Sequence, residues 1–176
     1  MKLAYLLIAA GGCWVLSEGL EVLSGGRNSL TLWLTAAFHL LIASGIWGAY
    51  AGQSGGRSGL SRLAAGTASL GYLILVYPPV AVSQAPSMTI GDFMSANPFF
   101  GIAGVLATLG IILFGISVLR YKSYPLWTGV VLIISPVIFA AIMMSEGPEP
   151  IGIAANVVEG IALIAMGKYA LRSQPG

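Results

Sequence analysis

Six long apolar stretches, separated by short polar or glycine- and proline-containing segments, dominate the pattern of this chain. Each has about 20 residues, which as an α-helix rising about 1.5 Å per residue is long enough to cross the roughly 30 Å hydrocarbon core of a bilayer. Prolines stand at or just before the start of three of them, where a helix does not need the missing N–H. The pattern predicts transmembrane helices over 3–23, 30–50, 60–77, 99–119, 126–144 and 151–171.

Composition places the chain in the class of integral membrane proteins. Of its 176 residues, 57% are hydrophobic and only 8% are charged, and the mean hydropathy is +0.89. This is too little polar surface to coat a soluble globule. We therefore expect one all-α membrane domain over 1–176, in contact with the lipid bilayer and without a nucleic-acid partner.

The distribution of charge predicts the orientation. If six helices alternate in direction, nearly all basic residues share one side of the membrane, namely Lys2, Arg57, Arg62, Arg120, Lys122, Lys168 and Arg172. Arg27 lies on the other side, together with Asp92, Glu146 and Glu149. Basic residues in short loops mark the cytoplasmic face. Both termini are thus expected inside, in a multi-pass protein of the cytoplasmic (cell) membrane.

The ends of three predicted helices resemble one another. The second ends Gly48-Ala-Tyr, the fourth Gly115-Ile-Ser-Val-Leu-Arg and the sixth Gly167-Lys-Tyr-Ala-Leu-Arg. These helices run in the same direction, so the pattern suggests a weak parallel repeat of two-helix hairpins. Chance similarity among helices rich in glycine and leucine is the competing explanation.

A few polar side chains lie inside the apolar stretches, and they are the best candidates for function. Ionisable residues within a membrane normally face the protein interior or a partner, because lipid does not solvate them. Given alternating helix directions, four of them fall at a similar level in the outer half: Glu18, His39, Asn156 and Glu159. Glu21 and Trp14 lie close to Glu18 along the same helix. These residues form one candidate ligand or proton site if the first, second and sixth helices are neighbours.

Four interpretations of this group stay open. It can bind and release protons, with His39 as a relay. It can hold a metal through Glu18, His39 and Glu159, although clustered ligand spacings are absent. It can recognise a polar or cationic headgroup beside Trp14. Finally, the glutamates can be structural, hydrogen-bonded to Asn156 or His39 to hold the helices together.

The longest predicted connection, Pro78 to Pro98, begins with a proline pair that should end or bend the third helix. Within it, Ser87, Thr89 and Asp92 can start a short helical turn. This turn is either a lid over an outward-facing cavity or a simple surface helix.

Enzymatic chemistry finds little support in the residue inventory. The chain has one histidine and one cysteine, so a bis-histidine haem and an internal dithiol are excluded within it. We expect no catalytic residues, and the sequence indicates no cofactor.

Two stretches carry a resemblance to other proteins. They are 40–60, with Gly45-Ile-Trp-Gly-Ala-Tyr-Ala-Gly-Gln, and 114–129, with Phe114-Gly and Pro125-Leu-Trp-Thr-Gly. Both are similar to stretches of small, uncharacterised multi-pass membrane proteins of bacteria. The resemblance implies the fold and a prokaryotic cytoplasmic membrane, and it implies no functional residue.

Two hypotheses for function follow. A small carrier or a protein for ion- or proton-coupled binding and transport should contain a polar cavity lined by Glu18, His39 and Glu159. A non-catalytic subunit or scaffold of a larger membrane complex should instead have a dry centre and a broad apolar face for a lipid, a pigment, a membrane protein partner or a second copy.

Overall fold

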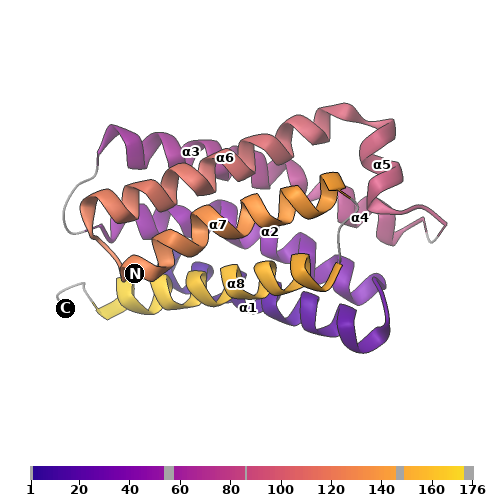
Figure 1. The fold of residues 1–176 in the computed structure, drawn as a ribbon, viewed down its shortest axis with the longest axis horizontal. Coiled ribbons are helices and arrows are strands. Elements are labelled where there is room, and N and C mark those ends of the chain that lie inside the picture. Colours follow the sequence, from indigo (N-terminus) through magenta and orange to yellow (C-terminus); the bar gives the residue numbers. More distant parts are fainter. Residues whose placement is uncertain (1, 54–57, 86, 146–148, 173–176) are drawn as a thin grey trace.

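The computed structural model describes residues 2–53, 58–85, 87–145 and 149–172. Arg57 and Glu146, which entered the charge argument, lie outside these residues, and of Lys2 only the backbone is described. Within the described residues the chain forms eight α-helices (Figure 1): α1 (Lys2–Ser24), α2 (Ser29–Ala51), α3 (Gly59–Leu75), α4 (Tyr77–Ser83), α5 (Ile90–Ala96), α6 (Pro98–Tyr121), α7 (Leu126–Ser145) and α8 (Glu149–Arg172). The prediction of an all-α bundle is confirmed.

In the part of the chain that the structure describes, five helical stretches are long and apolar enough to span a membrane. They are Leu3–Ser24, Ser29–Ala51, Gly59–Ser83, Pro98–Tyr121 and Glu149–Arg172, the third of which combines α3 and α4. The apolar part of α7 over Leu126–Ile142 is shorter. By helix length and hydropathy the chain is a multi-pass membrane protein with lipid-contacting helices. The predicted count of six spans depends on α7 and stays a prediction.

The long helices pack in chain order around a ring. Each of α1, α2, α3, α6, α7 and α8 contacts the next, and α8 closes the ring against α1. The start of α1 and the end of α8 lie at one end of the bundle, which we call the proximal end; α4 and α5 lie at the opposite, distal end (Figure 1). The condition that the first, second and sixth predicted helices be neighbours is met, since α1 packs against both α2 and α8.

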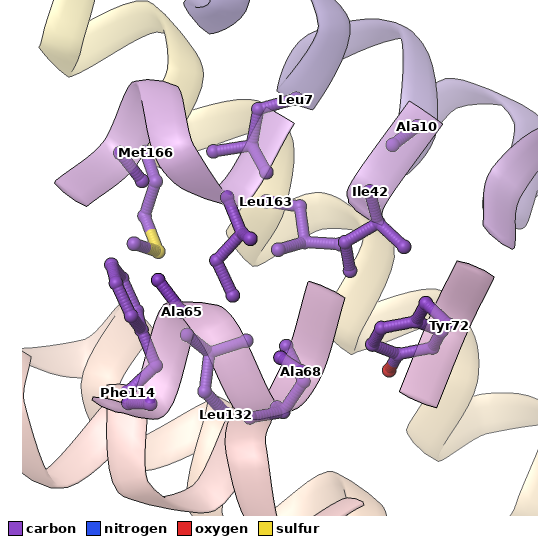
Figure 2. Packing of buried hydrophobic residues seen from close by; sticks show 14 of the residues in the cluster. Leu7, Ala10, Ile42, Ala65, Ala68, Tyr72, Phe114, Leu132, Leu163 and Met166 are labelled. Atoms are coloured by element: carbon purple, nitrogen blue, oxygen red, sulfur yellow. The ribbon is translucent and has the colours of Figure 1, made fainter. Parts of the chain in front are cut away.

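The centre of the ring is an apolar core. Figure 2 shows part of it, with Leu163 and Met166 of α8 clustered with Phe114 of α6 and Leu132 of α7. These side chains are almost completely inaccessible. Large apolar residues such as Leu109 are about half exposed on the outside of the bundle, where lipid chains replace water.

Small residues bring neighbouring helices into backbone contact. A methyl group added to Gly110 of α6 would overlap the Ala68 backbone of α3, and one added to Gly71 of α3 would overlap Ala107 of α6. The α1–α2 pair is packed in the same way, because a methyl group on Gly48 would lie 2.6 Å from the Leu3 carbonyl carbon. Such close approach is the main source of packing energy between helices in lipid.

The connection predicted over Pro78 to Pro98 is partly helical. The proline pair does break the third helix, which ends at Leu75, but α4 begins at once and continues to Ser83. The expectation of a loop from Pro78 was therefore wrong over this first part. Prolines are tolerated in the first turn of a new helix, because the backbone N–H that they lack has no partner there in any case. The proposed equivalence of two-helix hairpins stays a prediction.

Candidate functional site

A cavity of about 230 Å³ lies between the helices in the distal half of the bundle, and we call it the polar cavity because a few polar side chains interrupt its mostly apolar wall. Its lining includes three of the four predicted site residues, His39, Asn156 and Glu159, and also Trp14. Glu18 and Glu21 do not line it. The structure thus brings most of the predicted group together and divides it into a cavity-facing part and a part packed behind it.

Glu159 is the carboxyl group that faces the cavity. It lies on the inner side of α8 with only 5% of its surface exposed. Within the described residues its side chain has no hydrogen-bond or ion-pair partner, although it lines the cavity. A buried carboxyl group without a partner is costly, so its presence favours a role in binding a proton or a ligand.

Glu18 has the opposite environment. Its side chain is 2% exposed, and the Asn156 side-chain amide donates a hydrogen bond to its Oε1 atom over 2.9 Å. This bond joins α1 to α8. This is the contact that the structural interpretation of Glu18 expects. Asn156 also lines the cavity, so it lies between Glu18 and that space.

His39 is held by a contact that the sequence argument did not foresee. Its Nδ1 atom lies 2.8 Å from the Leu75 carbonyl oxygen and donates to it. In a continuous helix this carbonyl would accept from the residue four positions on, which is Pro79 and has no N–H. His39 thus supplies the hydrogen bond that the proline removes, and the pairing fixes its ring at the cavity wall.

Glu21 is paired with Arg27, the basic residue in the turn between α1 and α2. Both carboxylate oxygens of Glu21 accept from the Arg27 Nε atom, over 3.0 and 3.1 Å. Arg27 also lines the polar cavity and a second cavity of about 490 Å³ farther toward the distal end. Ile90 of α5 lines both cavities as well, so the two adjoin, and we call the second one the distal mouth.

The short helix α5 starts where it was predicted. Thr89 caps it and forms a reciprocal capping box with Asp92. Because the Thr89 hydroxyl and backbone N–H donate to the Asp92 carboxylate, they hold the pKa of this exposed group below its usual value. Ile90 and Met94 of α5 line the polar cavity, which favours the interpretation of this segment as a cover over the cavity.

Aromatic side chains form much of the remaining wall, and the sequence argument missed most of them. The Trp14 ring stacks on Phe38 with centroids 4.3 Å apart, and Phe38 meets the edge of Tyr72 at 5.5 Å. Phe139 of α7 adds a fourth ring. In a sequence, Phe and Tyr residues in the middle of a helix cannot be distinguished from ordinary core residues. Only their position around a cavity identifies them as part of its wall.

The metal hypothesis lacks a ligand set. In the described part of the chain, no three His, Cys, Asp or Glu side chains gather closely enough to hold a metal ion. Glu18 and His39 are instead occupied by Asn156 and by the Leu75 carbonyl.

Comparisons with protein-family models, with curated proteins and with solved structures find no match for this chain. They identify no family, and the likeness to small bacterial membrane proteins therefore depends on the sequence stretches alone. The function has to be inferred from the cavity and its residues.

Proposed function

We propose that this chain is a small six-helix membrane carrier or binding protein whose polar cavity takes a small molecule or ion, with Glu159 exchanging a proton at the same place. The observation that carries the proposal is a buried carboxyl group without a partner on the wall of a cavity of about 230 Å³. Ligand sites are typically such concave spaces, mostly apolar with a few convergent polar groups.

The surroundings of Glu159 fit a proton-exchanging group. The other titratable groups of this region are Glu18 and Glu21 on α1, Arg27 in the following turn, His39 on α2, Tyr72 on α3 and the exposed Glu149 at the start of α8. Four of them already have partners: Glu18 bonds to Asn156, Glu21 and Arg27 pair with each other, and His39 bonds to Leu75. Glu159 is thus the carboxyl group of this cluster that is free to change its protonation state.

The membrane arrangement belongs to the same proposal. With α7 as a sixth span, the single domain has both termini in the cytoplasm, because helix-end residues Arg120 and Arg172 lie at the proximal end. The polar cavity then opens outward through the distal mouth, beneath α5. The sequence likeness suggests a bacterial cytoplasmic membrane.

The alternative, a non-catalytic subunit or scaffold, predicts a dry centre. The cavity and its unpartnered carboxyl group favour a binding or transport protein over a scaffold, and no feature of the described residues favours an enzyme.

Modification by a hydrophobic carbodiimide tests the proposal, since this reagent reacts with protonated carboxyl groups that lipid-soluble molecules can reach. In membranes we expect an adduct at Glu159, located by mass spectrometry of peptides, and less adduct as the pH rises. Glu18, packed against Asn156, should stay unmodified. Glu149→Gln, an exposed change on the same helix, should leave the adduct at Glu159 unchanged.

The control for reactivity is the denatured protein, in which both glutamates should react. If Glu159 stays unmodified in the folded protein at every pH while the denatured protein is modified, the carboxyl group is sealed and the proposal is wrong.

A further inference from the structure

The chemistry of the polar cavity indicates what kind of molecule it takes, if the proposed function holds. Its wall combines one carboxyl group with the rings of Trp14, Phe38 and Tyr72. Phe38 and Tyr72 are buried, with 2% and 8% of their surface exposed. Aromatic faces together with a carboxylate attract cations, and they do so most strongly where water is excluded.

The charge around the cavity points in the same direction. Three carboxyl groups, Glu18, Glu21 and Glu159, are close to a single guanidinium, that of Arg27. Arg27 is neutralised by Glu21, to which its Nε atom donates twice. The Nδ1–H of His39 donates to the Leu75 carbonyl, and within the described residues no ion pair joins this ring to a carboxylate. The acidic group left without a countercharge is Glu159.

An inorganic cation is a poor match for this wall. Such ions need several oxygen or nitrogen ligands at short range. Within the described residues, no three His, Cys, Asp or Glu side chains gather closely enough to hold such an ion. The cavity is lined mainly by rings and aliphatic side chains, including Ile90 and Met94 of α5.

We infer that the ligand is a small organic cation, an amine or quaternary ammonium compound with apolar substituents, which lies against the aromatic rings with its charge toward Glu159. The cation replaces the proton on the carboxyl group, so that the cavity is electrically satisfied in both states. This inference rests on the proposed function and narrows it to one class of ligand.

The test uses the full-length protein in lipid nanodiscs and benzyltrimethylammonium as the probe. Neopentylbenzene, which has the same shape but carries no charge, is the matched ligand control. We expect the cation to bind, by calorimetric titration, and an excess of the neutral compound not to displace it. Phenylmethanesulfonate, an anion of similar size, should not bind.

Two variants on α8 locate the site. We expect Glu159→Gln to weaken cation binding about tenfold or more, and Glu149→Gln to leave it unchanged. Trp14→Leu should weaken it about tenfold through loss of one aromatic face. Because the comparison of charged and neutral compounds uses the unaltered protein, it remains decisive even if a variant does not fold.

The outcomes separate the two claims. If the neutral compound competes as well as the cation, if Glu159→Gln binds the cation as tightly as the unaltered protein, or if the cation does not bind at all, the inference about the ligand is wrong. The carbodiimide reaction at Glu159 then decides whether the proposed function survives without it.

Discussion

Two helix pairs of this bundle, α3–α6 and α1–α8, pack equally closely but by different means. Between α3 and α6 the backbone contacts come from glycine and alanine, with Gly71 against Ala107 and Gly110 against Ala68, and a hydrogen bond joins the buried hydroxyl groups of Ser61 and Ser117. The α1–α8 pair begins in the same way, with Gly11 against the Gly160 backbone, and then changes to the Glu18–Asn156 hydrogen bond near the distal end.

The difference shows where the molecule can hold a carboxyl group, since the α3–α6 pair accommodates the small hydroxyl groups of Ser61 and Ser117. A seam of small residues leaves no space between helices, so a carboxyl group there would have neither a partner nor water. On α8 the seam is bounded by Asn156 and Glu159, three residues apart and hence on neighbouring faces of the helix. Asn156 reaches back to α1, and Glu159 faces the cavity.

The largest effect should come from adding a methyl group to the α3–α6 seam. We expect Gly110→Ala to lower the free energy of unfolding by about 3 kcal/mol, because the added carbon overlaps the Ala68 backbone and the helices must separate. The measurement is unfolding in mixed micelles titrated with dodecyl sulfate.

Gly101→Ala, on the same helix, is the matched control. A methyl group there meets nothing within 4 Å, so the variant should be as stable as the parent or slightly more stable. Equal stability of the two variants would mean that the α3–α6 seam is not closely packed.

The polar part of the α1–α8 seam should be less sensitive. We expect Asn156→Leu to lower the free energy of unfolding by about 1 to 2 kcal/mol, because Glu18 loses its donor while remaining buried. Glu18→Gln keeps an acceptor for the Asn156 amide, so its stability should change by about 0.5 kcal/mol or less. If Glu18→Gln were the more damaging change, the carboxyl group at 18 would do more than hold helices together.

The smallest of the three effects on stability should come from the hydrogen bond between His39 of α2 and the Leu75 carbonyl at the end of α3. We expect His39→Phe to cost about 1 kcal/mol, because the Leu75 carbonyl loses its donor. Pro79→Ala restores a backbone N–H four residues after Leu75. The double variant should therefore be more stable than the sum of the two single changes predicts.

A double-mutant cycle on thermal unfolding in detergent measures this coupling. Additive effects would mean that the histidine does not substitute for the hydrogen bond that Pro79 lacks.

The sequence predicted the helices well because lipid imposes one demand on all of them. The ends of the predicted stretches differ by about two residues or fewer from the ends of the observed helices at nearly every position. A span must be long, apolar and internally hydrogen-bonded, and these properties are visible in the sequence. The exception is the segment after Pro78, which is helical to Ser83. Local rules predict that prolines break a helix, whereas the donor that His39 of α2 supplies to the Leu75 carbonyl at this break is visible only in the tertiary structure.

The sequence predicted which polar residues belong to the candidate site, but not the contacts that each of them makes. Polar residues inside apolar stretches are visible in a sequence, and helix direction places Glu18, His39, Asn156 and Glu159 at one level. Their roles depend on the angle at which each side chain leaves its helix and on what stands opposite. The positions of Phe38, Tyr72 and Phe139 in the cavity wall could not be predicted in this way, because aromatic residues are common in such helices.

The sequence by itself thus determined a membrane-spanning helical bundle and the short set of residues that lipid cannot accommodate alone, because hydropathy and charge act along the chain. Only the tertiary structure decided that two similar glutamates have different surroundings. Closure of the ring by α8 against α1 gives Glu18 a partner in Asn156, whereas Glu159, one turn farther along, is left facing a cavity.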